Sequence, residues 1–464
     1  MATTTVSIGS NQSIATVTPA SSSGSGPWVI TFTASVSANV AVGDIFVIED
    51  EVSFMSTYTY LLTGISGSDY TLKMVDDGGS GMGDMSPYGN FMRYDDEFNP
   101  VQASGTFKRA FSTITLFEAM VDDSSPSYWG TSDDVVGECH ADSAFTDSRV
   151  YFDNKQSLAS VKLTVNSDDR HDGTAGSGAV IRPTAGSGHN FGIIDVNIDN
   201  FIVEWLDFDL GSLDSANTNT AIRLEGTNDD NIVRNNLIHD KGGNPGGTGP
   251  LMIRGVGAGA STDTISILNN IIYNVAETGN DVAAAIYMVF WGGILNCYNN
   301  TVYNIASNGA SKSAWGFIFG NVTASVTNLK NNIVSVLVVD GTQATYARAY
   351  HKFAGGSTLN SDYNLSDDTT TGASYKATGA NSLIDKSLAQ IDFVSTTGGS
   401  EDLHLDTGSV CLEAGVDLGT TNEVNIDIDG VDRDATSVTW DMGADQASTA
   451  GADTGNPAFL MFVD

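Results

Sequence analysis

The sequence predicts an all-β chain: a parallel β-solenoid preceded by a small β-sandwich or β-barrel domain. Three observations carry this prediction. Pairs of asparagines before two apolar residues recur at steps of 30 to 34 residues. Short runs rich in Ile, Val, Tyr and Phe, bounded by Gly, Asn and Asp, fill the intervals, and no amphipathic helical pattern runs through them. A unit of about 30 residues cannot close a hydrophobic core alone, but stacked copies can.

The sequence of the first 92 residues predicts a separate β domain. Apolar β-type runs such as Trp28–Phe32 and Ile45–Ile48 are separated there by loops rich in Ser and Gly. We expect this domain to serve in attachment. The following segment, 93–190, is expected to hold a helix over 107–122 that caps the solenoid, because an open end exposes strand edges, and then the first coils.

The core of the solenoid is predicted over residues 191–366. Successive coils lie about 4.8 Å apart, so equivalent side chains stack directly on one another. An asparagine amide both donates and accepts hydrogen bonds, and asparagine tolerates the left-handed backbone of a sharp bend. We therefore expect a stacked ladder at one corner, with a worn copy of the pattern at Tyr363-Asn364. Its expected members are Asn235, Asn236, Asn269, Asn270, Asn299, Asn300, Asn331 and Asn332.

Two segments complete the expected organisation. Residues 367–448 are predicted to form C-terminal coils and a cap, and residues 449–464 a tail. The tail ends in an apolar run that would be a liability in water. Docking on a neighbouring subunit and covering the last coil are both open for this run, which comprises Phe459, Leu460, Met461, Phe462 and Val463.

The amino-acid composition limits the classes of partner that the chain can bind. The chain has 464 residues, with 56 Asp and Glu against 20 Lys and Arg, and a formal net charge of −36. This charge argues against binding nucleic acid through its phosphates and against docking on anionic lipid. The three cysteines have neither metal-ligand spacing nor an even number, so no disulfide framework is expected. We also expect no secretory signal at Met1 and no membrane insertion, because no apolar run approaches 18 residues.

The repeats and the C-terminal stretch resemble a known group. The repeats are followed by DLHL at 402–405, DIDGVDR at 427–433 and WDMGAD at 440–445. Together they resemble right-handed parallel β-helix proteins of the broad pectate-lyase-like group, with Gln446 as a departure from the usual acidic ending. VVGECH at 135–140 and DDRHDG at 168–173 are similar to β-helix proteins of phage and marine metagenomes. The resemblance covers residues 107–446 and implies the fold, which hosts lyases, hydrolases and adhesins alike.

Two groups of residues are candidates for chemistry. Glu225, Arg234, His239 and Asp240 could form the polar cleft of a polysaccharide lyase or glycoside hydrolase, although a solvated coil surface is the simpler interpretation. Asn425, Asp427 and Asp429 match the first half of a calcium loop. Thr436 stands where that loop needs its final acid, so a turn is the simpler account and a weak structural Ca²⁺ site stays open. No other cofactor is expected.

The expected function is that of a non-catalytic structural or adhesive β-helix protein of a virus particle, such as a phage tail spike, tail fibre or head decoration. The resemblance supplies the viral context. Expected partners are copies of the same chain, as in a homotrimer, other virion proteins and host surface glycans. Two alternatives stay open: a polysaccharide lyase or glycoside hydrolase on the same fold, and a prokaryotic protein of the cell surface, outside the cell, that forms filaments.

Overall fold

The computed structural model of the chain describes most of residues 3–447. The gaps are residues 12, 18, 24–27, 33–38, 49–57, 77–91, 95–99, 103–104, 123–128, 130–131, 185–190, 214–219, 227–228, 243–248, 258–259, 261, 279–281, 290–291, 308–312, 321–324, 340–346, 354–357, 368–374 and 437–438. The expected C-terminal tail, including Phe459 to Val463, lies outside the described residues.

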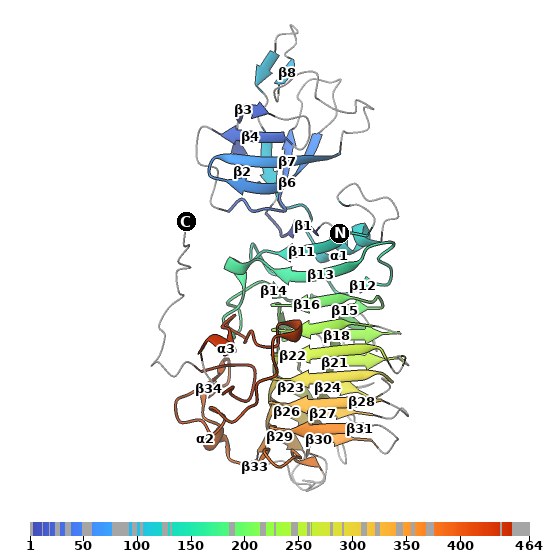
Figure 1. The fold of residues 1–464 in the computed structure, drawn as a ribbon, viewed down its shortest axis with the longest axis vertical. Helices are drawn as coiled ribbons and strands as arrows, with labels where there is room; N and C mark the ends of the chain where they lie inside the picture. The colour runs from blue at the N-terminus through green and yellow to red at the C-terminus, as the bar shows by residue number, and fades with distance from the viewer. Residues whose placement is uncertain are drawn as a thin grey trace.

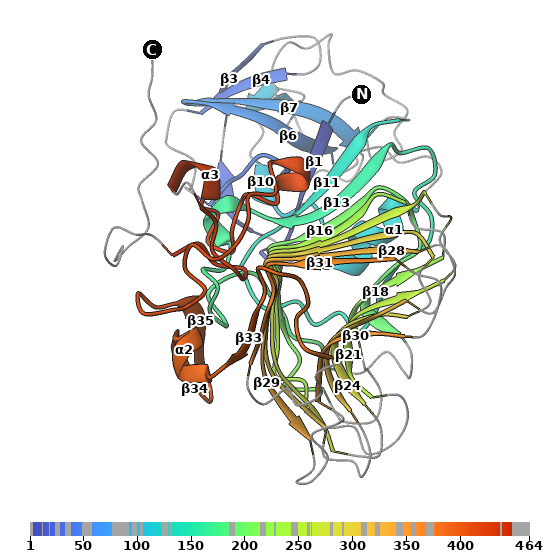
Figure 2. The same ribbon diagram turned by 60° about the horizontal axis from the view of Figure 1, so that its bottom comes forward.

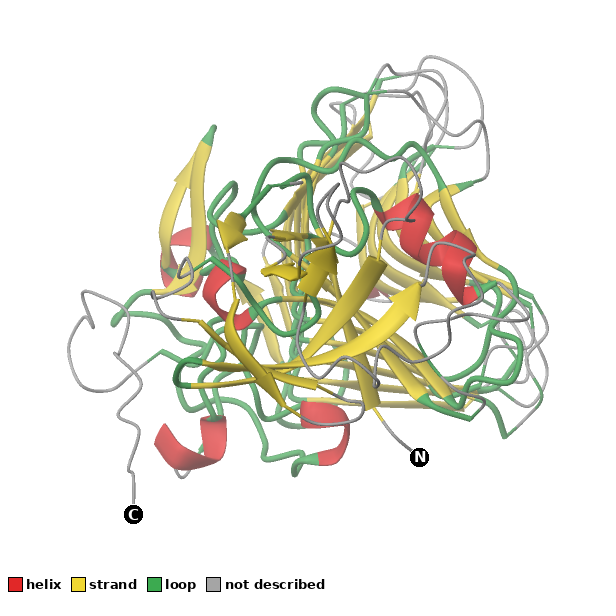
Figure 3. Cartoon of the chain, turned by 90° about the horizontal axis from the view of Figure 1, so that it is seen from above, coloured by secondary structure: helices red, strands yellow, loops and turns green. Residues whose placement is uncertain are grey.

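Three parallel sheets stack into a solenoid (Figure 1). A typical coil passes from sheet 1 to sheet 2 to sheet 3 and back. Figure 2 views the stack from its C-terminal end, where successive coils turn counterclockwise toward the viewer, which makes the β-helix right-handed. Figure 3 shows how little of the described chain is helical. The predicted all-β parallel β-helix is confirmed.

The strands of the solenoid divide among the three sheets as follows. Sheet 1 contains β1 (Thr3–Ile8), β11 (Asp134–Cys139), β13 (Ser160–Val165), β16 (Phe201–Glu204), β19 (Asn231–Arg234), β22 (Thr264–Leu268), β25 (Ile294–Tyr298), β28 (Val326–Lys330) and β31 (Thr358–Asp362). Sheet 2 contains β14 (Val180–Ile181), β17 (Asp207–Asp209), β20 (Leu237–His239), β23 (Ile271–Glu277), β26 (Thr301–Ser307), β29 (Ile333–Val339), β32 (Leu365–Asp367) and β33 (Leu383–Lys386). Sheet 3 contains β12 (Val150–Phe152), β15 (Gly192–Val196), β18 (Thr220–Glu225), β21 (Leu251–Val256), β24 (Ala283–Met288), β27 (Ala314–Phe319) and β30 (Ala347–Lys352).

The second asparagine of each pair forms a ladder inside the corner between sheets 1 and 2. The Asn270 Oδ1 accepts the backbone N–H and the Nδ2 of Asn236, both at 3.1 Å, and the pattern repeats on every following coil. Each Nδ2 also donates to a carbonyl of sheet 1, as Asn300 does to Ile267 at 2.8 Å. All of these amides are fully buried and paired, which is the condition for a stable buried polar network. The ladder comprises Asn236, Asn270, Asn300, Asn332 and Asn364.

The first asparagine of each pair does not belong to the expected stacked ladder and has a different role. Its φ lies between 51° and 57°, so it provides the left-handed bend. Its side chain points away from the inner ladder and donates to carbonyls of the C-terminal segment, as Asn269 Nδ2 does to Ile426 at 2.7 Å. These four residues, Asn235, Asn269, Asn299 and Asn331, form an outer row that binds residues 416–427.

The C-terminal segment differs from the expected coils and cap over 367–448. After β33 the chain leaves the stack, forms α2 (Leu388–Ile391) and the hairpin of β34 (Phe393–Thr397) and β35 (Ser400–Leu405), and returns along the side of the solenoid through α3 (Arg433–Thr436) (Figure 1). Its apolar side chains bury the outer faces of two sheets. One cluster joins Phe393, Leu403 and Met442 to sheet 2, and another joins Val424 and Trp440 to sheet 1.

The N-terminal domain is an antiparallel sheet whose limits differ from the expected 1–92. Strand β1 belongs to the solenoid, because it pairs in parallel with β11. The domain ends only with β10, which pairs with β2 and β5. Its sheet, in spatial order, contains β2 (Ala15–Val17), β10 (Gly105–Lys108), β5 (Ile45–Ile48), β6 (Tyr58–Ser66), β7 (Asp69–Asp76), β4 (Trp28–Phe32) and β3 (Pro19–Ser23), and a separate small sheet contains β8 (Met92–Tyr94) and β9 (Pro100–Gln102).

A buried arginine joins this domain to the solenoid. Arg109 is 4% exposed; its Nη1 lies 3.0 Å from Asp44 Oδ1 in the domain, and its Nε lies 3.0 Å from Asp142 Oδ2 in the first coil. Asp44 is fully buried. Burial raises the pKa of Asp44, against the opposing effect of Arg109. The junction is therefore a packed ion-pair network.

The predicted cap is a shorter helix, α1 (Ile114–Val121), at the N-terminal end of the stack. Thr113 caps its first turn by accepting the N–H of Leu116 at 3.1 Å. Ile114, Phe117 and Val121 face the solenoid core. A Cβ at Gly137 of β11 would lie 2.7 Å from the Phe117 ring, so only glycine admits this helix. No helix in the described part of the chain is long and apolar enough to cross a membrane.

Candidate functional site

The four candidate catalytic residues lie at strand ends of three different sheets. Glu225 ends β18 in sheet 3, Arg234 ends β19 in sheet 1, and His239 ends β20 in sheet 2, with Asp240 after it. The structure joins His239 to Asp240, while Glu225 and Arg234 each have other partners. The four residues therefore do not form a single cleft.

Arg234 belongs to the framework that binds the C-terminal segment. Its Nη2 lies 2.5 Å from Glu204 Oε2, and both side chains are 3% exposed. The Nη1 donates to the carbonyl of Asn422 at 2.6 Å, and Nη2 also pairs with Glu423. Burial would raise the pKa of Glu204, but the charge of Arg234 and then that of Lys162 lower it. The guanidinium thus ties two coils to the returning segment.

His239 lies between two carboxylates. Its Nε2 is 2.8 Å from Asp207 Oδ1, which is fully buried, and its Nδ1 is 2.9 Å from Asp240 Oδ2. Burial would lower the pKa of His239, but its hydrogen bonds to Asp207 and Asp240 outweigh burial and raise the pKa to about 9. The ring stacks on Tyr273 at 5.2 Å between centroids. At neutral pH this residue is an imidazolium with both N–H groups donated, so it has no lone pair for a base or a metal.

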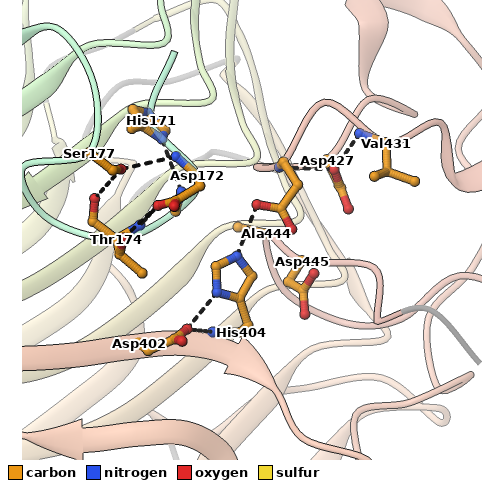
Figure 4. Close-up of polar contacts among 12 residues, drawn as sticks. His171, Asp172, Thr174, Ser177, Asp402, His404, Asp427, Val431, Ala444 and Asp445 are labelled. Carbon is orange, nitrogen blue, oxygen red and sulfur yellow. Dashed lines mark hydrogen bonds and ion pairs between the residues drawn. The ribbon is translucent and has the colours of Figure 1, made fainter. Parts of the chain in front are cut away.

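A second histidine lies between the hairpin and the returning segment (Figure 4). His404 Nδ1 is 2.5 Å from Asp402 Oδ1 and its Nε2 is 3.1 Å from Asp429 Oδ1. Burial would lower the pKa of His404, but these hydrogen bonds raise it to about 12. A Cβ at Gly173, whose φ is +81°, would lie 2.5 Å from the imidazole, so the turn before β14 needs glycine to receive it.

Ligand atoms that could surround a metal ion gather at these two histidines. They belong to Asp209, His239 and Asp240, and to His404, Asp429 and Asp445. Both nitrogens of each ring already form hydrogen bonds with carboxylates, so neither nitrogen is open to a metal in this arrangement. These clusters therefore fit ion-paired joints between segments better than metal centres.

The partial calcium motif forms a closed turn. Asp427 Oδ1 accepts the N–H groups of Asp429 and Val431 at 3.0 and 2.7 Å, and its Oδ2 accepts that of Gln446. Asn425 Nδ2 donates to Asp432 at 2.9 Å. Burial raises the pKa of Asp427 to about 8. These contacts are those of a carboxyl that organises a turn.

The outer face of sheet 3 carries an arginine-rich stripe that the sequence reasoning missed. Strand pairing aligns one outward residue from each coil into a column. We call this column and its neighbours the arginine–aromatic face. The column runs Tyr151, Asp195, Arg223, Arg254, Tyr287, Ile318, His351, and beside it lie Arg149, Phe191, Glu225, Trp315, Arg348 and Tyr375.

Ring contacts and ion pairs organise the upper part of this face. The Arg149 guanidinium lies 4.0 Å from the Phe191 ring centroid and 4.6 Å from that of Tyr151. Its Nε is 2.6 Å from Asp195 Oδ2, and Arg223 Nη2 is 2.9 Å from Glu225 Oε1. Glu225, proposed above as catalytic, is therefore the ion-pair partner of Arg223. Burial and the neighbouring Arg223 charge lower the pKa of Arg254.

The lower part of the face is a run of stacked rings. Tyr287 stacks on Trp315 at 6.2 Å and Trp315 on His351 at 6.3 Å. The Arg348 guanidinium lies 4.5 Å from the Tyr375 ring centroid. Burial and then the Arg348 charge lower the pKa of His351 to about 4, so this ring is neutral at pH 7. The signal in the sequence is the spacing of Arg223 and Arg254, which matches the coil repeat.

Comparisons with known proteins add little to this geometry. No family model and no curated protein matches the chain. Among the solved structures that match, one is the tailspike protein gp49 from Pseudomonas phage LKA1. It is 12% identical, with a TM-score of 0.19, and the match covers 82% of this chain and 72% of that one.

Proposed function

We propose that this protein is a non-catalytic structural and adhesive component of a virus particle. The solenoid would act as a rigid shaft, the N-terminal domain as its attachment, and its side as a surface for binding host glycans. The viral location rests on the resemblance of the repeats and the C-terminal ending to β-helix proteins of phage. We further propose that the chain works as a closed homo-oligomer such as a trimer.

One observation carries the structural role. The strand-end side chains that would serve an enzyme are paired within the framework: His239 between Asp207 and Asp240, and Arg234 with Glu204 and Glu423. Such pairs join coils to one another and to the C-terminal segment. A catalytic acid or base needs a pKa near the working pH and a side chain that its substrate can reach. The hydrogen bonds of these groups instead stiffen the contacts between coils and with the C-terminal segment.

Labelling of particles tests the proposal. An antibody raised against this chain should decorate purified virus particles at an appendage, and the purified chain should sediment as a small closed oligomer. Particles without the label would overturn the viral role. Long filaments assembled by the purified chain in the absence of any particle would favour a cell-surface or filament-forming protein instead.

A polysaccharide lyase or glycoside hydrolase is the second candidate, favoured by the position of Glu225 beside Arg223 and near Arg254. Incubation with acidic polysaccharides, followed by assays for reducing ends and unsaturated ends, separates the two. We expect no depolymerisation. Depolymerisation that Glu225→Ala or Asp240→Ala abolishes, with folding unchanged, would make the protein an enzyme.

A further inference from the structure

We propose that Glu138 and His140 bind a divalent transition metal of the zinc class at the N-terminal end of the solenoid. The inference goes beyond the proposed function, because the site needs neither a virus particle nor a glycan.

The strand places the two side chains on one face. Glu138 lies in β11, close to the N-terminal domain (Figure 1), and His140 follows the strand directly. Cys139 between them is fully buried in the core. Because side chains alternate along an extended chain, the residues on either side of an inward cysteine point outward together. The spacing of two residues therefore brings a carboxylate and an imidazole side by side.

An unpaired ring nitrogen indicates that a ligand belongs between them. His140 is 3% exposed, and its Nε2 has no hydrogen-bond partner among the described residues. Glu138 Oε1 lies 3.9 Å from this nitrogen, beyond hydrogen-bond length. The Nδ1 lies 3.0 Å from Asp169 Oδ2, an acceptor, so Nδ1 carries the ring proton. The Nε2 lone pair and the carboxylate oxygen are thus two acceptors, and a cation between them binds to both.

The contacts behind the two ligands match those of metal-bound side chains. A metal-bound histidine usually donates its other N–H to a carboxylate, and a metal-bound carboxylate is itself hydrogen-bonded. Asp169 has the first role, and Asn166, whose Nδ2 donates to Glu138 Oε1 at 2.7 Å, has the second. Asn166 also caps the short helical turn Ser167–Asp169 by accepting the N–H of Asp168 at 3.1 Å. One capped turn therefore orients both ligands.

Distance and ligand type select the metal. With bonds of about 2.1 Å, two ligand atoms of a tetrahedral zinc site lie about 3.4 Å apart, so Glu138 has to approach by about 0.5 Å. Its side chain is 22% exposed, which allows this movement and lets water complete the coordination shell. An imidazole ligand favours zinc-like ions, whereas Ca²⁺ and Mg²⁺ take oxygen ligands.

The other described histidines lack this arrangement. In three of them both ring nitrogens already make hydrogen bonds: His171, His239 and His404. His351 has an unpaired Nδ1, but its Nε2 lies 3.2 Å from Arg348 Nη1, whose charge repels a metal cation. Among the described residues, His140 is thus the histidine whose unpaired nitrogen faces a carboxylate.

Zinc titration of the intact chain without an affinity tag tests the site. Calorimetry should find one saturable Zn²⁺ site, and X-ray absorption at one equivalent of zinc should show one imidazole nitrogen in the coordination shell. Ca²⁺ and Mg²⁺ at the same concentrations should not displace the zinc. Bound zinc should raise the melting temperature, because it binds the folded chain.

Three variants and a control locate the site. His140→Gln and Glu138→Gln should each weaken zinc binding by about tenfold or more, and Asp169→Asn by roughly 10–100-fold, the usual effect of losing a contact behind a ligand. The matched control is Glu225→Gln, which changes another partly exposed glutamate, one that pairs with Arg223. It should bind zinc as the parent does.

Three outcomes would overturn the inference: no saturable zinc site, a shell of oxygen atoms alone, or zinc binding by both ligand variants that equals that of the parent. Glu138→Gln keeps the size of the side chain and an oxygen that accepts from Asn166, so it should fold as the parent does. If His140→Gln does not fold, the zinc affinity of Glu138→Gln decides, and an affinity equal to that of the parent would reject the site.

Discussion

The two asparagines of each pair point in opposite directions, and the backbone conformation determines which of them points into the corner. Asn299 takes φ of 56° and directs its amide out to the Val424 carbonyl, whereas Asn300 directs its amide into the corner, where coils above and below both bond to it. Only the inward residue lies between two equivalent copies. The inner ladder should therefore contribute more to stability than the outer row.

Asn300→Ala and Asn299→Ala compare the two positions. Asn300→Ala removes the side-chain partner of the Asn270 backbone N–H and of the Ile267 carbonyl in a fully buried site, while Asn270 Nδ2 and Asn332 Oδ1 each keep a second partner. At about 1–3 kcal/mol for each unpaired group, it should lower the free energy of unfolding by about 3–5 kcal/mol. Asn299→Ala loses one outward bond and forces alanine into a left-handed bend, at about 1–3 kcal/mol. Urea denaturation measures both, and equal losses would contradict the assignment of roles.

The protonated His239 predicts a dependence of stability on pH. Its pKa is raised to about 9 in the folded chain, against about 6.5 when unfolded. Its stabilising contribution is therefore complete below about pH 6.5 and is lost as the pH rises through about 9. The melting temperature of the parent should fall between pH 7 and 10 more steeply than that of His239→Gln. Parallel profiles for the two proteins would show that the histidine is not held in its charged form.

At the scale of elements, the C-terminal segment behaves as a strap along the solenoid, organised by one side chain. Arg433 is fully buried, and its Nη2 donates to the carbonyls of Gly443 and Ala444 at 2.9 and 2.8 Å. Those carbonyls lie in the stretch whose N–H groups bond to Asn331 and Thr301 of the coils. The guanidinium thus shapes the strap so that it fits the outer row of asparagines.

Arg433→Met should loosen the strap without unwinding the coils. The methionine fills similar volume but leaves the carbonyls without donors, a loss of about 3–5 kcal/mol for a buried charged partner. Amide hydrogen exchange should accelerate over residues 416–446 and stay slow in β22, β25 and β28. Arg182→Met, which breaks a half-exposed pair with Asp209, is the control and should change neither region. Uniform acceleration through the whole chain would mean that strap and coils unfold together.

Contacts that recur on every coil can be predicted from the sequence, whereas contacts that occur only once cannot. The inner ladder follows from Asn270 and Asn300 because their spacing is the coil length itself. The strap contacts join residues such as Asn235 and Asp427, which are 192 positions apart, so no period reports them. The arginine–aromatic face lies between these cases. Arg223 and Arg254 keep the coil spacing, but the column also contains Asp195 and Tyr287, and a stripe of mixed residue types becomes visible only when the strands are in register.

At the scale of the whole molecule, the two folded parts meet at a joint that combines an ion-pair network with apolar packing. Arg109 bridges Asp44 of the N-terminal sheet and Asp142 of the first coil, and β1 leads from the solenoid into the domain. Phe46 and Phe107 pack inside the N-terminal domain, whereas Leu61 of its sheet belongs to the apolar core that runs along the stacked coils, and Ile45 packs against that core. The ion pairs should therefore stabilise the joint, and the apolar contacts should keep the two parts together when the ion pairs are lost.

Arg109→Met tests this joint. It leaves the buried Asp44 carboxylate without its cation, so the joint should loosen while both parts remain folded. Small-angle scattering should show a broader range of long dimensions than for the parent, and circular dichroism should show an unchanged strand signal. Arg109→Lys keeps the charge but cannot reach both carboxylates with a planar fork, so it should fall between the two. A loss of strand signal in Arg109→Met would instead make the joint part of the folding core.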